Sequence, residues 1–183
     1  MTYISILRGI NLAGHNPIKM DELKKLFADL GFTHIQTYIQ SGNLIYQQRK
    51  TDTKKLSELI KNKIKRQFGF DVPVVTLTID ELKKIAVLNP FSKDKTKDSS
   101  FFHVTFLADK PEPENLNKIR DYSYQNDEFR LIDKAIYLYC PNGYGITKLS
   151  NSFFENKLKL TATTRNWKTT NELISIADKI SSS

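Results

Sequence analysis

The order of strand-like and helix-like segments in the first 88 residues is the feature that most limits the folds open to this chain. Short apolar runs, which are typical of strands, alternate with amphipathic stretches, which are typical of helices. The order is strand, helix, strand, strand, helix, strand, with one helix added, over residues 2–7, 23–30, 33–39, 43–48, 51–68, 72–78 and 78–88. A strand–helix–strand unit that occurs twice is the ferredoxin-like arrangement, in which two helices pack on one face of a four-stranded sheet.

Local signals support this order. In the second helix, one face is predicted to carry Leu56, Leu59, Ile60, Ile64 and Phe68. Lysines occupy the other face, which we interpret as a solvated face. Gln40-Ser41-Gly42 lies between two strand-like runs and predicts a hairpin. Pro73 stands near the start of the fourth strand, so we predict an edge position for that strand.

The second half repeats part of this pattern. Residues 89–100, NPFSKDKTKDSS, are polar and charged and predict a linker. From its end onward, strand-like and helix-like segments lie at 100–108, 111–123, 128–133, 134–140, 150–160 and 169–180. Residues 161–169, TATTRNWKT, predict a connection between two helices, so the last strand of this ferredoxin-like unit is replaced or displaced. We predict an α+β fold of two ferredoxin-like subdomains, 1–88 and 101–183.

The balance of charge favours anionic partners. The net charge is +8, and residues 1–92 carry 14 basic and 8 acidic side chains, so most of the positive field belongs to the first half. Such a surplus attracts nucleotides, nucleic acid or acidic protein surfaces, although a lysine-rich surface also serves solubility.

Residue counts exclude several classes of protein and site. No run approaches the roughly 18 apolar residues of a membrane span, and no secretion leader is recognisable. Cys140 is the only cysteine, which excludes an intrachain disulfide and a cysteine-based zinc site and fits a cytoplasmic location. The three histidines, at 15, 34 and 103, are scattered, so we expect no metal site. The sequence identifies no cofactor.

The loop between the first strand and the first helix has the spacing of a phosphate-binding loop but not its chemistry. Gly9 and Gly14 match G-x-x-x-x-G, yet Gly14 is followed by histidine and asparagine, where a Walker loop has lysine and then serine or threonine. A nucleoside-triphosphatase loop is therefore not expected. The loop still offers five polar side chains, Arg8, Asn11, His15, Asn16 and Lys19. It is either an anion- or ligand-binding loop or a structured crossover whose glycines supply positive φ.

The stretch 161–169 is the second candidate for a binding site. Arg165 can bind a carboxylate or phosphate through two hydrogen bonds, and Trp167, the only tryptophan, can stack on a base. The alternative is structural, with Trp167 anchoring the connection to the core and Arg165 satisfying backbone groups at helix ends.

Three stretches give the sequence a family resemblance. LRGINLAGHNPIKMDELKKLFADLGF, TYIQSGN and TTRNWKT occur in the order typical of the bacterial family known as domain of unknown function 1697, which the sequence resembles over nearly its whole length. Members have LRGIN-x-GG, whereas this chain has Ala13 in place of the first of the two glycines. The resemblance implies a bacterial-type protein with a two-part α+β fold. The family is uncharacterised, so the resemblance implies no activity and no catalytic residues.

Because these stretches are polar and fall in predicted loops, we hypothesise that they converge in a groove between the two halves and bind a nucleotide or nucleic acid. The candidate ligand-binding residues are Arg8, Asn11, His15, Lys19, Ser41, Asn43, Arg165, Asn166 and Trp167. One alternative is an enzyme that acts on a small phosphorylated metabolite, with His15 as its acid or base. The other is a protein-interaction module in which both loops are structural.

Overall fold

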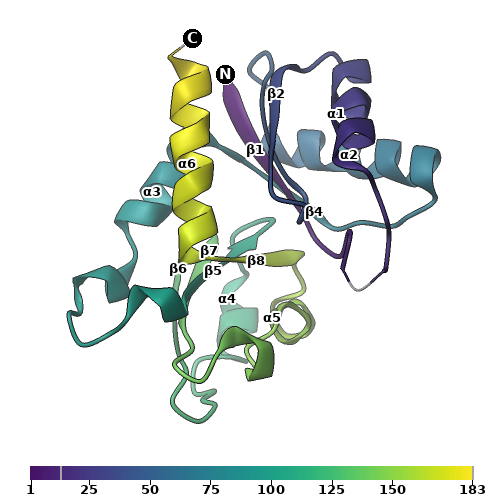
Figure 1. Cartoon of the computed structure of the whole chain (residues 1–183). Coiled ribbons are helices and arrows are strands. Elements are labelled where there is room, and N and C mark those ends of the chain that lie inside the picture. The colour runs from purple at the N-terminus through teal and green to yellow at the C-terminus, as the bar shows by residue number, and fades with distance from the viewer. Residues whose placement is uncertain (13, 183) are drawn as a thin grey trace. The chain divides into compact units, whose positions relative to one another are not determined.

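The computed structural model describes residues 1–12 and 14–182, and the chain divides into two compact units (Figure 1). The first unit contains Met1–Lys83 and the chain from Glu172 onward, and the second contains Lys84–Asn171. Each unit is built on one four-stranded antiparallel sheet. The predicted domain limits, 1–88 and 101–183, stay a prediction.

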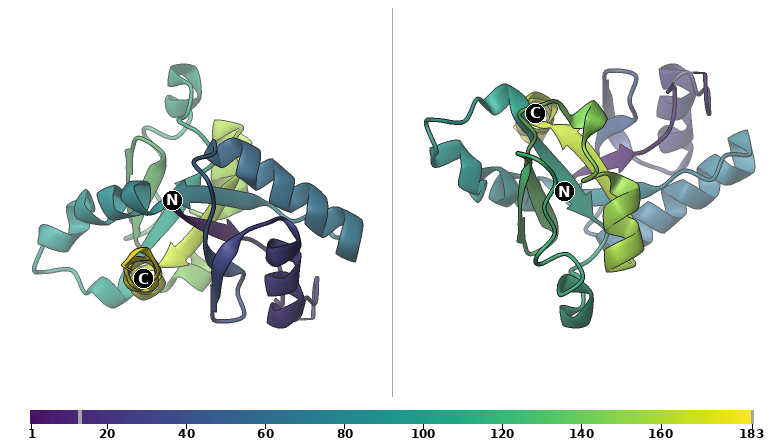
Figure 2. Two further views of the ribbon diagram at one scale, coloured as in Figure 1. Left: turned by 90° about the horizontal axis from the view of Figure 1, so that it is seen from above. Right: turned by 90° about the horizontal axis from the view of Figure 1, so that it is seen from below.

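The first unit has the predicted ferredoxin-like order. Its elements are β1 (Thr2–Leu7), α1 (Met20–Asp29), β2 (Thr33–Tyr38), β3 (Asn43–Gln47), α2 (Thr53–Phe68), β4 (Val74–Thr78) and the beginning of α3 (Ile79–Val87). The strands pair in the order β2-β3-β1-β4, so β4 is an edge strand, as Pro73 predicts. Both α1 and α2 pack on the same face of this sheet (Figures 1 and 2).

The apolar stripes of α1 and α2 form the core of the first unit with one face of its sheet. Leu26 of α1 and Ile60 of α2 are fully buried, and the central strands contribute Tyr3 and Tyr46, whose ring centroids lie 5.9 Å apart. Asp52 caps α2 by accepting a backbone N–H of its first turn at 3.0 Å. The periodicity that predicted these helices therefore identifies most of their buried faces. Leu59 is an exception, because it was predicted on the apolar face of α2 and is exposed.

The last helix, α6 (Trp167–Ser181), begins in the second unit and completes the first. In its later part Leu173 and Ala177 are fully buried. Three polar contacts attach it to the first unit. The hydroxyl of Ser181 lies 2.8 Å from that of Thr2, and the carbonyl of Ile180 accepts a hydrogen bond from the Gln47 amide at 3.1 Å. The Asp178 carboxylate forms an ion pair with the Lys83 ammonium at 2.5 Å. The first unit is therefore discontinuous in sequence.

The second unit is also ferredoxin-like. Its helices and strands are β5 (Phe102–Leu107), α4 (Pro113–Leu116), β6 (Glu128–Ile132), β7 (Ala135–Tyr139), α5 (Asn151–Leu158), β8 (Ala162–Asn166) and the beginning of α6, with 3-10 helices η1 (Pro90–Lys93), η2 (Ser99–Phe101) and η3 (Tyr144–Ile146). The strands pair in the order β6-β7-β5-β8, which repeats the order of the corresponding strands in the first unit. The predicted fold class, two ferredoxin-like α+β halves, is confirmed.

One detail of that prediction is wrong, because most of the connection predicted at 161–169 is strand β8. β8 pairs antiparallel with β5 and completes the sheet, so the second half ends in helix, strand, helix rather than in two helices. The strand escaped detection because it carries threonines where apolar residues would mark a strand. The hydroxyl of Thr164 is satisfied inside the unit, since it donates to the side-chain oxygen of Asn151 at 2.7 Å and lies 2.7 Å from the hydroxyl of Thr105.

Residues 89–100, whose composition predicts a linker, are packed on the sheet of the second unit. Phe91 is buried, with its ring centroid 6.3 Å from that of Tyr139 on β7. Lys97 forms an ion pair with Glu128 on β6, and its ammonium lies 4.4 Å from the centroid of the Tyr139 ring. This segment is therefore tied to two strands of the sheet.

Candidate functional site

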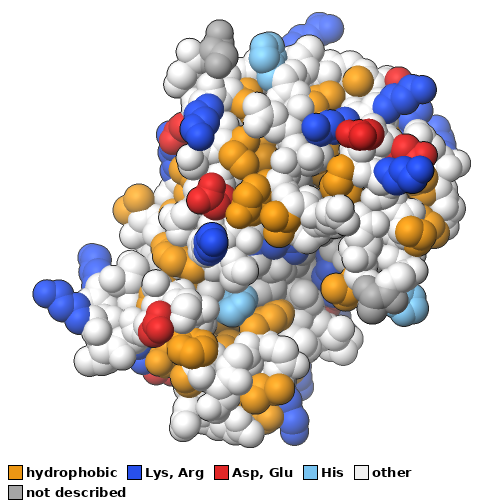
Figure 3. Space-filling model, viewed as in Figure 1, with side chains coloured by type: hydrophobic (Ala, Val, Ile, Leu, Met, Phe, Trp, Pro, Cys, Tyr) orange, Lys and Arg blue, Asp and Glu red, His pale blue; other side chains and the backbone are white. Residues whose placement is uncertain are grey.

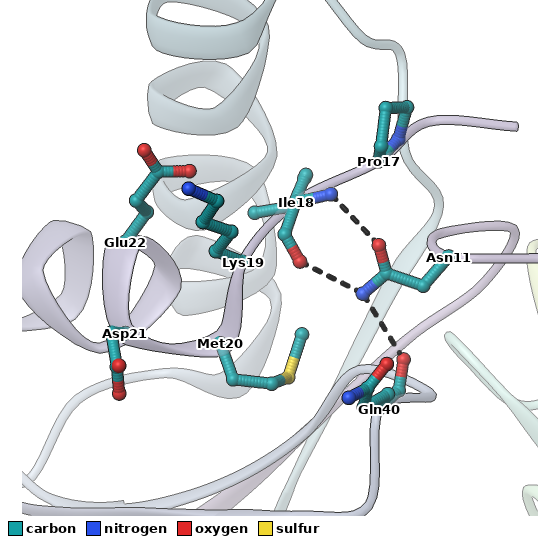
Figure 4. Close-up of a pocket in the computed structure, with 8 residues that line it drawn as sticks. All are labelled: Asn11, Pro17, Ile18, Lys19, Met20, Asp21, Glu22 and Gln40. Atoms are coloured by element: carbon teal, nitrogen blue, oxygen red, sulfur yellow. Dashed lines mark hydrogen bonds between the residues drawn. The ribbon is translucent and has the colours of Figure 1, made fainter. Parts of the chain in front are cut away.

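Asn11, one of the predicted ligand-binding residues, holds the loop between β1 and α1 in place (Figure 4). Its side-chain amide donates to the carbonyls of Ile18 at 2.8 Å and Gln40 at 3.2 Å, and its Oδ1 accepts the N–H of Ile18 at 2.8 Å. Its φ of 53° lies in the left-handed region, which asparagine tolerates better than most residues. These contacts use most of the hydrogen-bonding capacity of the side chain and favour the structured-crossover interpretation for Asn11.

Asn16 closes the same loop. Its side-chain amide donates to the carbonyl of Gly9 at 2.9 Å, and its own carbonyl accepts the N–H of Asn11 at 3.2 Å. The N–H of His15 donates to the carbonyl of Leu12 at 2.8 Å, while the side chain of His15 is exposed. The loop is therefore shaped by its own asparagines and backbone groups.

The hairpin residues Ser41 and Asn43 also make structural contacts. The buried Asn43 amide donates to the carbonyl of Tyr38 at 3.1 Å and to the hydroxyl of Ser41 at 2.8 Å. Gly42 has a φ of 77°, and a Cβ at this position would lie 2.7 Å from the Cβ of Leu7. Its carbonyl accepts the N–H of Leu7 at 2.8 Å. Only glycine lets the hairpin approach the end of β1 this closely.

A cleft of about 500 Å³ lies beside these loops in the first unit (Figure 4). Its lining residues are Asn11, Pro17, Ile18, Lys19, Met20, Asp21, Glu22 and Gln40. The cleft brings together two predicted binding residues, Asn11 and Lys19; outside its lining lie Arg8, His15, Ser41 and Asn43. The lining of the cleft contains two carboxylates, Asp21 and Glu22, and one lysine, Lys19, so its net charge is negative and the cleft is a poor match for an anion.

The second unit contains a cavity of about 410 Å³ at the start of α6. Side chains from η2 and its cap, from β5 and from the β8–α6 junction line it: Asp98, Ser99, Ser100, His103, Asn166, Trp167 and Lys168. The pairing of β5 with β8 sets His103 opposite Asn166. Asn166 and Trp167 were predicted as binding residues, whereas the others were not.

His103 contributes a half-buried imidazole to the cavity wall. Its ring stacks on that of Tyr144, with centroids 4.7 Å apart and an interplanar angle of 20°. Burial lowers the pKa of His103 below its usual value, and the hydrogen bond to the Phe101 carbonyl, 3.3 Å from Nδ1, offsets part of that effect. A neutral ring that donates from Nδ1 has Nε2 as an acceptor.

Trp167 and Lys168 form the first turn of α6. The side chain of Asn166 caps this helix by accepting the N–H of Thr169 at 2.7 Å, so α6 begins two residues before its predicted start. The half-buried Trp167 indole meets the ring of Phe102 edge to face, with centroids 6.4 Å apart. Lys168 is exposed. The junction therefore offers an aromatic ring and a cation side by side in sequence.

Asp98 and the two serines that follow it supply hydroxyl groups and one carboxylate. Asp98 accepts the N–H of Ser100 at 2.8 Å, and hydrogen bonds from Ser100 lower the pKa of its carboxyl group. The carboxylate is therefore ionised at neutral pH and accepts hydrogen bonds, whereas the hydroxyls of Ser99 and Ser100 can donate them.

Arg165 does not line this cavity. Successive residues of a strand face opposite sides, so Arg165 and Asn166 lie on different faces of β8. The Arg165 guanidinium donates to the carbonyl of Thr164 at 2.8 Å, and burial lowers its pKa to about 10 despite the opposing effect of Tyr144. These contacts favour a structural role for Arg165 over a role in binding phosphate. The convergence of the predicted loops in a groove stays a prediction.

Other kinds of site find little support within residues 1–12 and 14–182. No group of three His, Cys, Asp or Glu side chains in this part of the chain could hold a metal ion. Among the same residues, no helix combines the length and apolar character that crossing a membrane requires. Burial and the charge of Asp127 raise the pKa of the Cys140 thiol to about 12, which argues against a nucleophilic role.

The fold defines an α+β protein of two ferredoxin-like units with a small cavity at the start of its last helix. The same fold occurs in the conserved bacterial protein SP0830 from Streptococcus pneumoniae, with a TM-score of 0.73 and 18% sequence identity over 96% of this chain and 98% of that chain. No curated protein matches the sequence.

The chain belongs to the family described as protein of unknown function (DUF1697), whose model matches residues 1–137. The match includes LRGINLAG and QSGN but ends before TTRNWKT. The family assignment therefore rests on the residues that shape the first unit and on the first strands of the second, and not on the β8–α6 junction.

Proposed function

We propose that the cavity at the start of α6 binds a nucleoside phosphate or a similar anionic ligand that carries an aromatic ring. The observation that supports the proposal is the gathering of an indole, an imidazole, an ammonium group and two hydroxyls around a single cavity of about 410 Å³. That volume lies within the roughly 300–1,000 Å³ typical of small-ligand sites. A cytoplasmic location, which the single cysteine favours, is part of the proposal.

The phosphate of such a ligand would lie near Lys168. The ammonium group supplies the charge, and the hydroxyls of Ser99 and Ser100 line the same cavity as donors. Because Lys168 lies in the first turn of a 15-residue helix, the positive end of the helix dipole adds to its field.

The base and the sugar would face the other lining groups. Trp167 offers a ring for stacking, and the Nε2 of His103 accepts a hydrogen bond from an N–H of the base. The Asp98 carboxylate would repel a second phosphate but accepts hydrogen bonds from sugar hydroxyls. This arrangement favours a ligand with a single phosphate and a sugar over inorganic phosphate or a triphosphate.

Fluorescence of Trp167 tests the proposal, because it is the only tryptophan. Adenosine and uridine monophosphate, ribose 5-phosphate and inorganic phosphate are titrated at low salt. We expect a saturable change with at least one of the monophosphates. Lys168→Gln should raise Kd about tenfold or more, the loss expected for a hydrogen bond to a charged group.

The matched control is Lys157→Gln, which removes the same charge from an exposed position of α5 and should bind like the parent. Equal Kd values for the two variants and the parent would contradict the proposal. A flat, blue-shifted emission with every ligand would identify Trp167 as a structural anchor and favour the protein-interaction alternative.

An enzyme acting on a small phosphorylated metabolite is the second candidate function. The observation that favours it is a half-buried imidazole in the cavity, because a neutral imidazole can accept a proton. His103 suits this role better than His15, which is exposed and does not line the cleft of the first unit. The activity is measured as phosphate release from sugar phosphates over a range of pH. The dependence of the rate on pH should disappear in His103→Gln and remain in His15→Gln.

A further inference from the structure

Helix α2 of the first unit is strongly basic. Six of its sixteen residues are lysine or arginine, and one is acidic. Its core-facing residues, Leu56, Ile60 and Ile64, are buried and fix which side of the helix faces solvent. Helix α1 of the same unit differs, because the basic side chains over α1 lie beside acidic ones (Figure 3). The excess of basic side chains on α2 is therefore not matched on α1.

One side of α2 carries cations that have acidic neighbours. Lys54, Glu58, Lys61 and Lys65 follow one another at spacings of four, three and four residues and so share a face. Lys61 and Lys65 lie 3.5 Å and 3.4 Å from the carboxylate of Asp71, and their charges lower its pKa. The field of this side is partly neutralised within the unit.

The adjacent side of α2 carries cations that form no ion pair with the described residues, although the Asp52 carboxylate, which accepts the N–H of Lys55 at 3.0 Å, and Glu58 lie near its first turn. Lys55, Leu59, Asn62 and Arg66 follow the same spacing, and Lys63 lies one turn beyond Leu59. Within the described part of the chain, Lys55, Lys63 and Arg66 form no ion pair. All of these side chains are exposed except Lys63, which is half-buried. From Lys55 to Arg66 this basic stripe is about 16 Å long, at 1.5 Å per residue.

We infer that the basic stripe of α2 binds the backbone of duplex nucleic acid without regard to sequence. Complementary charge supplies the attraction, because unneutralised lysine and arginine side chains are what phosphates bind. The stripe contains no aromatic side chain, and single-strand binding relies on aromatic stacking, so the duplex is the expected partner. The cations project from a rigid helix in one row, which suits the regular row of phosphates along a duplex strand. This surface is independent of the cavity at the start of α6.

The salt dependence of duplex binding measures the contact. If the three cations neutralise three phosphates, the logarithm of the association constant should fall with the logarithm of the salt concentration at a slope of about −2.7. The affinity should therefore fall about 40-fold between 50 and 200 mM salt. The assay is fluorescence anisotropy of a labelled 20-base-pair DNA duplex, with a single strand of the same length as comparison. We expect the duplex to bind more tightly than the single strand.

Two triple variants separate the stripe from net charge. Lys55→Gln/Lys63→Gln/Arg66→Gln should remove most of the slope and lower the affinity at 50 mM at least tenfold. Lys54→Gln/Lys61→Gln/Lys65→Gln removes the same charge from the other side of the helix. In this variant the slope of log K against log salt should change by less than one. Both variants keep the helix propensity nearly unchanged, and circular dichroism verifies that they fold.

Three outcomes would overturn the inference: equal losses in the two triple variants, which would indicate net charge alone; tighter binding of the single strand; or no binding of the parent at 50 mM. Lys157→Gln, which removes a charge that belongs to neither site, should leave duplex binding unchanged. The two proposals are tested with different ligands and different variants, so a failure of the cavity proposal is distinguishable from a failure of this one.

Discussion

Replacing Gly42 with alanine tests how closely the β2–β3 hairpin approaches the end of β1. Gly42 has a φ of 77°, which an alanine adopts only with strain. Its Cβ would lie 2.7 Å from the Cβ of Leu7 and 3.0 Å from the Cδ1 of Ile10. The Cβ of Leu7 is fixed to the backbone of a central strand, so it cannot move without disturbing the sheet.

The expected loss is the sum of two effects. The left-handed conformation costs about 1–2 kcal/mol for an alanine. Overpacking against Leu7 and Ile10 adds about 1–3 kcal/mol. Gly42→Ala should therefore lower the free energy of unfolding by about 2–5 kcal/mol, a large part of the stability of an ordinary domain.

Gly31→Ala is the matched control, because Gly31 has a φ of 80° and no atom lies within 4 Å of its would-be Cβ. It shares the conformational cost and the change in unfolded-state entropy but not the overlap. Calorimetry should give a Tm for Gly42→Ala about 2–12 °C below that of Gly31→Ala, from the typical 2–4 °C per kcal/mol in chains of this size. Equal Tm values would refute the argument from close approach.

Three further predictions concern single residues. Asn11→Ala should lower the free energy of unfolding by about 1–3 kcal/mol and raise hydrogen exchange at the backbone amides of residues 9–12, 14–16 and 18, since its side chain makes three backbone hydrogen bonds. Unchanged exchange in that loop would contradict it. Because burial holds the pKa of His103 below its ordinary 6.5, this residue's contribution to stability is complete above pH 6.5 and declines as the pH falls below it. Urea titrations at pH 5 and 7 should therefore differ less for His103→Gln than for the parent. Cys140, whose thiol pKa burial raises to about 12, should resist Ellman's reagent at pH 8 in the folded chain and react at once in urea; rapid labelling without urea would contradict its burial.

Most of the fold follows from short-range periodicity. The stripes of α1 and α2 and the hairpin around Gly42 depend on residues a few positions apart, and the structure agrees with them. Strand β8 could not be identified in this way, because its buried positions include Thr163 and Thr164, and the hydroxyl of Thr164 is satisfied by Thr105 on β5 and Asn151 on α5. A strand that is stabilised by its partners leaves no pattern in its own sequence.

The candidate site shows the same limit. Asn166 and Trp167 were predicted as binding residues from their residue types alone. His103 lies beside them only because β5 pairs with β8, about 60 residues further along the chain. Conversely, Asn11 and Asn43 resembled ligand-binding amides, whereas their hydrogen bonds go to backbone carbonyls and a neighbouring hydroxyl. Residue type alone does not distinguish an amide that binds a ligand from one that supports a loop.

The discontinuous first unit has a consequence for synthesis on the ribosome. Residues 1–83 emerge early, but the helix that supplies Leu173 and Ala177 emerges only after the whole second unit has been made. At about 5–20 residues per second, the nascent sheet waits roughly 4–18 s for that helix. During this interval the groups that α6 later contacts, among them the Thr2 hydroxyl and the Gln47 amide, lack that partner, and the incomplete unit can be bound by chaperones or by neighbouring nascent chains. The second unit, whose residues are contiguous, can close before the first is complete.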